Sequence, residues 1–267
     1  MPHNGIVTLL SDFGLSDVYV GVMKGVIAQI NPRLTVVDLT HQIPPQNIAA
    51  GRFCLMSAYP YFPEGTVHVA VVDPGVGTNR RAVAVEFNAG YLVGPDNGLF
   101  SGVISQGSAI AAVELNNPSY WRTAEPSTTF HGRDIFAAVA AHIASGVPLE
   151  QMGRAIDPNA LVQLPIPEYT ATDARIEGCI QYVDHFGNLI TNIPGILVEG
   201  KIWSVEMAAS IVPGNNTYRD SPAGSPIALV GSHGWVEIAV NGGNAHSQLQ
   251  MNWGDAVQVM VTRVSKR

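Results

Sequence analysis

The residues with the clearest chemical potential are an acid and an arginine pair that follow one apolar run. The run 68–72 ends at Asp73, which opens the turn DPGVG (73–77), and Arg80 and Arg81 come shortly after. An apolar run bounded by Pro and Gly predicts a buried strand that stops abruptly. In an open α/β sheet, ligands bind outside the carboxyl ends of the strands. The turn therefore places a carboxylate and guanidinium groups where such a protein binds ligands, although a hairpin with solvated Asp and Arg has the same pattern.

Two further loops carry a polar group directly after a strand or before a helix. Asp12 follows the apolar run 5–10, and His131 lies in FHGRD (130–134), just before a helical run. An Asp, an Arg and a His together can orient and polarise a water molecule, because one group takes a proton and the guanidinium stabilises negative charge. A helix N-terminus disfavours a cationic imidazole, so a neutral His131 is expected. A capping or packed histidine is the alternative interpretation.

The elements that must position these groups alternate in type along the first part of the chain. Apolar runs at 5–10, 34–39 and 67–72 predict strands, and helical spacing predicts helices over 18–30, with Asp17 as N-cap, and 48–59. The β-α-β-α-β order predicts a mostly parallel sheet with helices on its faces. Further strands are expected at 82–87, 91–93 and 109–114, and further helices at 99–104 and 135–144.

The character of the chain changes after a stretch that is rich in proline. Residues 157–172 have no clear period and are interpreted as a linker, with domains at 1–169 and 170–267. Short apolar runs then predict strands at 175–183, 189–192, 200–205, 226–230, 235–239 and 257–261, without a helical period. The expected fold class is α/β: an N-terminal α/β domain with a mostly parallel sheet, and a C-terminal all-β, barrel-like domain.

Composition narrows the classes of function. The chain has 267 residues, of which 46% are hydrophobic and 13% charged, and this suits a large core in two domains. A net charge of -7 disfavours a nucleic-acid partner. No apolar run approaches the roughly 20 residues of a membrane helix. The amino terminus lacks the basic region of a signal peptide, so a cytoplasmic protein is expected.

Cofactor motifs are absent from the sequence. No HExxH or CxxC motif and no helical histidine pair supports a metal site. No GxGxxG follows the first predicted strand and no P-loop is present, so dinucleotide and nucleoside triphosphate binding by those routes are unsupported. The sequence therefore predicts a site that works without a metal or cofactor.

Six ordered motifs resemble the S-adenosylmethionine (SAM) hydroxide adenosyltransferases, relatives of the fluorinase and the chlorinase. The motifs are SDFG (11–14), DPGVG (73–77) with Arg80, PDNG (95–98), FHGRD (130–134), DHFGNLITN (184–192) and SHG (232–234). The resemblance implies a homotrimer whose sites lie between the N-terminal domain of one subunit and the C-terminal domain of the next. It also implies hydrolysis of SAM to adenosine and L-methionine, by attack of water or hydroxide on the ribose C5′.

The resemblance implies that an Asp, an Arg and a His hold the attacking water. Asp73, Arg80 and His131 match these positions, and Arg80 rather than Arg81 keeps the spacing of the family. A sulfonium is already an excellent leaving group, so the reaction needs an aligned, desolvated oxygen and neither a metal nor a cofactor. The halogenases lack this polar triad, and a carboxylate repels a halide, so the sequence favours water.

The resemblance also implies substrate-binding residues in both domains. Asp12 would bind the ribose hydroxyls, Asp184 the methionine ammonium and Asn188 the adenine edge. Ser232 would hold the methionine carboxylate beside His233, which stands where the halogenases carry an arginine. The other expected contacts are Phe13, Val76 and Phe130 around C5′, Tyr218 stacked on adenine, Val240 and Gly242 through their backbone, and Asp17 and Phe186.

Two other functions stay open at this point. One is a halide-dependent adenosyltransferase on the same fold, which an assay that replaces water by chloride or fluoride distinguishes. The other is a non-catalytic SAM- or adenosine-binding protein, which an assay for adenosine release distinguishes.

Overall fold

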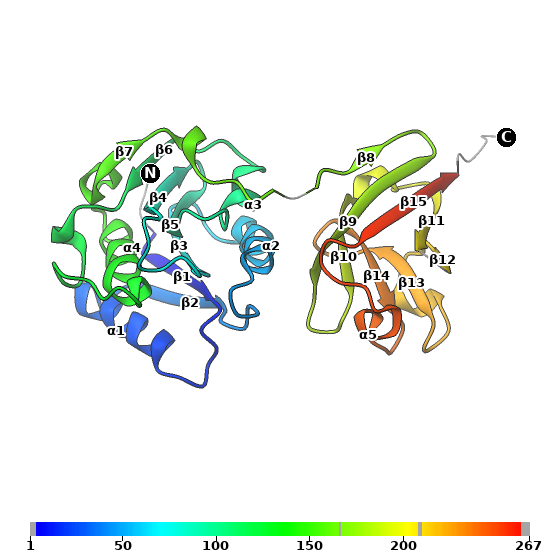
Figure 1. Ribbon diagram of the computed structural model, residues 1–267, viewed down its shortest axis with the longest axis horizontal. Helices are drawn as coiled ribbons and strands as arrows, with labels where there is room; N and C mark the ends of the chain where they lie inside the picture. The colour runs from blue at the N-terminus through cyan, green and yellow to red at the C-terminus, as the bar shows by residue number, and fades with distance from the viewer. Residues whose placement is uncertain (1–3, 166, 208–209, 263–267) are drawn as a thin grey trace. The chain divides into compact units, whose positions relative to one another are not determined.

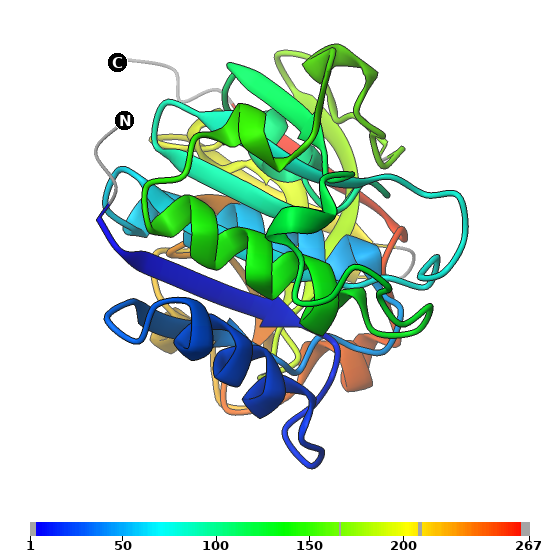
Figure 2. The same cartoon turned by 90° about the vertical axis from the view of Figure 1, so that its left-hand side faces the viewer.

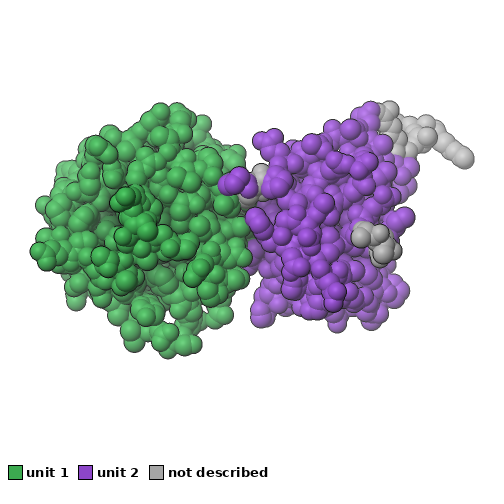
Figure 3. Space-filling model, viewed as in Figure 1, with its two compact units in different colours: residues 1–164 green, residues 165–267 purple. Residues whose placement is uncertain are grey.

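The computed structural model describes residues 4–165, 167–207 and 210–262, and the chain forms two compact units. Unit 1 is Met1–Leu164 and unit 2 is Pro165–Arg267 (Figure 3). The predicted fold class is confirmed, because unit 1 is α/β and unit 2 is all-β and barrel-like. The domain boundary at 169/170 stays a prediction. Residues 1–3, which entered the prediction about a signal peptide, lie outside the described residues.

The described part of unit 1 contains a mixed seven-stranded sheet with the order β2-β1-β3-β5-β4-β6-β7. Strand β1 pairs in parallel with β2 and β3, and β3 with β5, whereas β4, β6 and β7 join antiparallel. The sheet is thus mixed, with half of its strand pairs parallel, where the prediction was a mostly parallel sheet. The parallel order ends at the hairpin of β4 and β5, which needs no crossover helix. The strands are β1 Ile6–Ser11, β2 Thr35–Thr40, β3 Thr66–Val71, β4 Ala82–Phe87, β5 Gly90–Pro95, β6 Ala111–Glu114 and β7 Arg154–Ile156.

Helices cover both faces of this sheet. Helices α1 (Tyr19–Ile30) and α4 (Ala137–Ala144) pack together on one face, and α2 (Ile48–Ala58) and α3 (Ser101–Ile104) on the other (Figures 1 and 2). Strand β3 is buried over its full length, as expected for a strand that is covered on both sides. Short helical turns lie at Tyr59–Tyr61, Pro118–Tyr120, Leu149–Met152 and Pro158–Ala160.

Two local predictions near the site are wrong. Asp17 does not cap the first helix, which begins at Tyr19 without a side-chain cap. The helix predicted from Ile135 begins earlier, as a π-helical turn over Gly132–Phe136 that continues into α4. The turn opens with Gly132, Arg133 and Asp134, which supply no apolar spacing, so the pattern from Ile135 onward carried no signal for this earlier start.

The described part of unit 2 is a nearly closed antiparallel barrel with the order β12-β11-β15-β9-β10-β14-β13, and β8 pairs with β9. A bridge between Gly214 and Ala228 links the two ends of this sheet. The strands are β8 Thr170–Ala171, β9 Arg175–Val183, β10 Leu189–Pro194, β11 Ile202–Met207, β12 Ser210–Pro213, β13 Pro226–Val230, β14 Trp235–Val240 and β15 Ala256–Thr262. The unit also has turns at Gly195–Leu197 and Tyr218–Asp220 and the short helix α5 (Ala245–Leu249), which the sequence did not predict.

None of the described helices is long and apolar enough to cross a membrane.

Candidate functional site

The loops that carry the two acids of unit 1 lie at the same edge of the sheet. Strands β1 and β3 are parallel neighbours, with Ser11 opposite Val71. Asp12 directly follows β1, and Asp73 lies two residues after β3. Because the carboxyl ends of parallel strands open toward ligands, these carboxylates belong to one candidate site.

Asp73, Arg80 and His131 form one hydrogen-bonded group. Arg80 Nε lies 3.0 Å from each oxygen of Asp73, and Arg80 Nη2 lies 2.5 Å from Oδ2. The same Nη2 lies 2.7 Å from His131 Nδ1. The side chains of Arg80 and Asp73 are only 10% and 5% exposed, so the ion pair is shielded from solvent. The structure thus brings His131 to the loop that carries Asp73 and Arg80, which places the three predicted residues together.

The turn between Asp73 and Arg80 is closed by its glycines. Val76 N–H donates to the Asp73 carbonyl, which tightens the turn. Gly77 has φ +78, and a Cβ at this position would lie 2.4 Å from the Thr128 carbonyl oxygen. Only glycine fits there, and the contact brings the turn against the segment that leads to His131.

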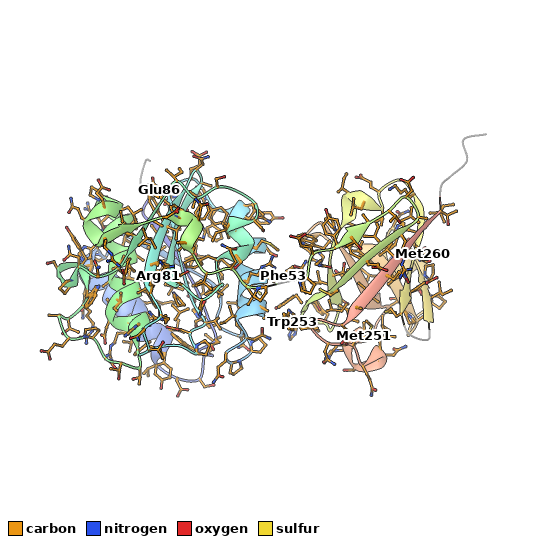
Figure 4. The ribbon with its side chains drawn as sticks, turned by 45° about the horizontal axis from the view of Figure 1, so that its top comes forward. Phe53, Arg81, Glu86, Met251, Trp253 and Met260 are labelled. Atoms are coloured by element: carbon orange, nitrogen blue, oxygen red, sulfur yellow. The ribbon has the colours of Figure 1, made fainter. Side chains whose placement is uncertain are left out.

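The adjacent arginine is committed elsewhere. Arg81 is labelled in Figure 4. Its Nε donates to Asp96 at 2.8 Å, and its Nη2 donates to the Ala160 carbonyl. Asp96 also accepts a hydrogen bond from Val162 N–H. Arg80 therefore contacts the site, whereas Arg81 ties the start of β4 to the end of unit 1.

A cavity of about 440 Å³ lies beside this group and opens at the sheet edge. It collects predicted residues from all three loops of unit 1, but not Asp17, which is exposed outside it. Its walls are formed by Asp12, Phe13, Tyr19, Pro45, Gln46, Val71, Asp73, Pro74, Val76, Thr129, Phe130, His131 and Gly132.

Three aromatic rings form one wall of the cavity. Phe13 and Phe130 meet edge to face with their centroids 5.7 Å apart, and Tyr19 lies 5.2 Å from Phe130. The sequence predicted Phe13 and Phe130, but it missed Tyr19. The only signal for Tyr19 is that it opens the first helix beside the Asp12 loop. The wall offers an apolar surface of the kind that small-molecule sites use.

The electrostatic surroundings of His131 favour a neutral ring. Burial lowers the pKa of His131, and the Arg80 guanidinium lowers it further, against an opposite effect of Asp73. A guanidinium has no acceptor, so its contact requires an unprotonated Nδ1 on His131. The neutral ring then carries its hydrogen on Nε2.

The segment that carries His131 is anchored by a buried acid that the sequence analysis did not single out. Asp134 is fully buried and accepts hydrogen bonds from Arg122, Arg133 and Ser127 N–H at 2.6–2.9 Å. Burial alone raises its pKa, but the hydrogen bonds from Arg133 and Arg122 hold the pKa of Asp134 well below its usual range. The acid is therefore ionised, and it ties the π-helical turn to the preceding loop.

In unit 2, three predicted residues share one compact loop. Asp184 Oδ1 accepts from Phe186 N–H at 2.9 Å and from Asn188 N–H at 2.8 Å, and Oδ2 accepts from the Asn188 side chain. Phe186 is 71% exposed. The loop thus presents a fixed carboxylate beside an exposed aromatic ring.

A second group in unit 2 joins Tyr218 and His233 through Glu237, which the sequence analysis missed. Tyr218 Oη donates to Glu237 Oε1 at 2.8 Å, and His233 Nε2 lies 3.1 Å from Oε2. Burial and this carboxylate raise the pKa of Tyr218. Trp235 N–H donates to His233 Nδ1, so both ring nitrogens of His233 already have partners. An acid inside the apolar run 235–239 was the available signal for Glu237.

The remaining predicted residues of unit 2 take part in neither group. Ser232 is exposed, Val240 is buried at the end of β14, and Gly242 lies in the following turn with φ +70. Within the part of the chain that the structure describes, no group of three His, Cys, Asp or Glu side chains could hold a metal ion.

Comparisons with known proteins point to one family. The profile of the SAM hydroxide adenosyltransferase N-terminal domain matches residues 7–153, and that of the C-terminal domain matches residues 178–258. The chain is 43% identical to "(R)-S-adenosyl-L-methionine hydrolase" of Salinispora arenicola, over 95% of this chain and 97% of the relative. It is 31% identical to "Fluorinase" of Actinoplanes sp., over 90% of this chain and 93% of that protein.

A solved structure has the same fold along nearly the whole chain. It is an uncharacterized conserved protein from Thermotoga maritima, 35% identical, with a TM-score of 0.89 over 95% of this chain and 99% of the other.

Proposed function

The chain belongs to the SAM hydroxide adenosyltransferase family, and from this premise we propose that it hydrolyses SAM to adenosine and L-methionine. The name of the Salinispora relative specifies the (R) epimer of the sulfonium, and we extend that preference to this chain. The observation that carries the proposal is the hydrogen-bonded Asp73–Arg80–His131 group, whose members Asp73 and His131 line a cavity. Asp73 and His131 offer an acceptor and a donor for one water molecule beside the aromatic part of the wall.

In the proposed mechanism, the water lies between Asp73 and His131. His131 Nδ1 faces Arg80, so Nε2–H is the donor that the ring has left for the water oxygen. Asp73 is then the acceptor for a water proton, and Arg80 offsets its charge. The water oxygen bonds to the ribose C5′ as the C5′–S bond breaks, and the electron pair stays on sulfur as the neutral thioether of methionine. The proton leaves through Asp73 to solvent.

The mechanism requires no metal and no cofactor, because the leaving group is a neutral thioether. What the protein must supply is alignment of the water with the C5′–S bond and removal of bulk water. The buried ion pair and the aromatic wall of Phe13, Tyr19 and Phe130 support both requirements.

We assign substrate contacts in two sets. In unit 1, Asp12 binds the ribose hydroxyls, and Phe13, Val76 and Phe130 surround C5′. In unit 2, Asp184 binds the methionine ammonium, Asn188 binds adenine, and the further contacts are Phe186, Tyr218, Ser232, His233, Val240 and Gly242. The partners already present on His233 leave Ser232 as the more available group for the methionine carboxylate. A homotrimer, in which unit 2 of one subunit serves the site of another, belongs to this proposal.

The second candidate is transfer to halide, and the fluorinase similarity favours it. A halide in the position of the water would meet the Asp73 carboxylate, which repels it. Two donor nitrogens of Arg80 are already directed at Asp73 and His131. We therefore place water before halide as the nucleophile.

The test is incubation of the protein with each SAM epimer, with and without chloride or fluoride. We expect adenosine and methionine in equal amounts from the (R) epimer and no halogenated nucleoside. Asp73→Ala is the matched control: it should abolish turnover while adenosine binding stays measurable. A wild-type protein that binds adenosine and releases none from SAM is a binding protein, and a halogenated product would make it a halogenase.

A further inference from the structure

A second chain of polar side chains lies beneath the loop 12–17 at the cavity. Ser11 Oγ lies 2.8 Å from His41 Nδ1, and His41 Nε2 lies 3.1 Å from Asp38 Oδ1. Ser11 and His41 are 1% and 3% exposed, whereas the Asp38 side chain is 39% exposed. The chain therefore runs from the surface at the end of β2 to the end of β1, where the candidate site begins.

The hydrogens along this chain run in one direction. Asp38 can only accept, so the hydrogen on His41 Nε2 is directed at Asp38 Oδ1. In the matching tautomer His41 Nδ1 accepts from the Ser11 hydroxyl, and Ser11 Oγ accepts from Phe13 N–H at 3.3 Å. Lys24 Nζ donates to the second oxygen of Asp38 at 2.6 Å. The polar side-chain atoms of Ser11, His41 and Asp38 thus all have matching partners, which buried polar groups require.

The order Ser–His–Asp is also that of a nucleophilic triad, but the geometry excludes that role. A nucleophilic serine must reach a substrate atom. Ser11 is buried, and the cavity walls do not include it. The chain instead reaches the backbone of the cavity wall, at Phe13 N–H and, through the His41 carbonyl, at Gly14 N–H, 2.8 Å away.

The segment 38–46, which carries Asp38 and His41, also contacts the loop 12–17 at Asp12. Gln46 N–H donates to Asp12 Oδ2 at 2.7 Å, and Gln46 has φ +65, a left-handed conformation that is unfavourable for a residue other than glycine. Residues 38–46 thus fix the Asp12 carboxylate through Gln46 and the backbone beneath it through His41.

We propose that His41 is a positioning residue for substrate binding, and that it acts through Ser11 and its own carbonyl on the segment 12–14. The inference rests on the proposed function, because it assigns the ribose to Asp12 and the C5′ wall to Phe13. These two residues bind substrate and do not hold the attacking water. Loss of the hydrogen bonds that link Ser11, His41 and Asp38 should therefore weaken the binding of SAM and adenosine more than it slows the chemical step.

The structure offers a matched control on the same strand. Thr8 Oγ1 lies 2.8 Å from His68 Nδ1, and both residues are buried. This pair has the same hydroxyl–imidazole chemistry, but His68 packs against Tyr59 and Phe62 and neither member lines the cavity. Ser11→Ala and Thr8→Val each remove one buried hydroxyl, and they differ in whether the hydroxyl serves the site.

The experiment compares these variants by kcat, KM, adenosine affinity and amide hydrogen exchange at Phe13 and Gly14. For Ser11→Ala we expect about a tenfold rise in KM and in the adenosine Kd, with kcat changed by less than about threefold and with faster exchange at both amides. Thr8→Val should leave all four unchanged. Equal effects of the two variants would reduce His41 and Ser11 to a structural role and overturn the proposal.

A second variant keeps the test decisive if Ser11→Ala does not fold. Asp38→Asn keeps an oxygen acceptor for His41 and changes only a half-exposed side chain outside the cavity. It should raise KM and exchange at Phe13 in the same direction and by less, and unchanged values of both would overturn the proposal. Hydrogen exchange and adenosine binding can be measured without turnover, so they test the role of His41 even in a protein that does not hydrolyse SAM. A wild type that leaves SAM intact would refute the proposed function and not the role of His41.

Discussion

At the scale of single residues, two adjacent arginines have different tasks. Arg80 bonds Asp73 and His131, whereas Arg81 bonds Asp96 and a backbone carbonyl. Arg80 was assigned to the site because its distance along the sequence from Asp73 matches the family motif. The structure explains why this spacing was needed for the assignment. Both arginines follow the same turn, and composition alone cannot assign one of them to the site.

The pair of arginines gives a matched prediction. Arg80→Lys keeps the charge but loses the planar fork that contacts both Asp73 oxygens and His131, so kcat should fall roughly 100-fold or more. Arg81→Lys should leave kcat close to the wild-type value, since its partners lie away from the cavity. Steady-state kinetics of both variants checks this, and equal losses would contradict the assignment.

The state of His131 predicts the pH dependence of the reaction. Burial and Arg80 lower the pKa of His131 below its ordinary 6.5, and the neutral ring is the form that accepts from Arg80. Activity should therefore persist as the pH falls to 6.5 and decline only below it, as the ring takes up a proton. The acid limb of kcat/KM against pH measures this. A limb centred above 6.5 would show that the ring works in another state.

At the scale of elements, the sequence predicted the strands that deliver Asp12 and Asp73, because buried runs that end in Pro, Gly and polar residues leave a clear pattern. It predicted the wrong start for the helix behind His131, because the first three residues of the π-helical turn, Gly132 to Asp134, are not apolar and give no helical period. The contact of His41 with Ser11 spans 30 positions along the chain, and only the pairing of β1 with β2 brings the residues together.

The π-helical turn predicts a stability effect of Asp134. Asp134→Asn removes the charge from a fully buried group that accepts from Arg122 and Arg133, whose side chains are 40% and 30% exposed. We expect a loss of about 2 kcal/mol in unfolding free energy, a figure reduced for the exposure of the arginines. Glu114→Gln, in the exposed pair with Arg154, is the control and should cost less than about 1 kcal/mol. Equal costs in denaturant titrations would show that Asp134 does not anchor the turn.

At the scale of the whole molecule, the sequence predicted both architectures. It missed α5 and β12, because segments of four or five residues are too short to establish a period. It also predicted residues for one site in both units. Most of those in unit 1 line one cavity, whereas Asp17 lies outside it. In unit 2, five of them belong to the Asp184 loop or to the Tyr218–Glu237–His233 group, and Ser232, Val240 and Gly242 belong to neither.

The proposed homotrimer predicts complementation between two impaired variants. Asp73→Ala damages unit 1 and Asp184→Ala damages unit 2, so each should have little activity alone. If unit 2 of one subunit serves another, co-refolded mixtures should regain activity in roughly a quarter of the sites. A mixture of Asp73→Ala with His131→Ala is the control and should regain none. No recovery in the first mixture, with trimers present by sedimentation, would place each site within one chain.

The most direct test of the account is the source of the oxygen in the product. We predict that incubation with SAM in ¹⁸O-labelled water gives adenosine with one labelled atom, at the 5′ oxygen, because water held by Asp73, Arg80 and His131 forms the new bond to C5′. Adenosine that forms without the label would contradict the account, because its 5′ oxygen would then come from a group other than water.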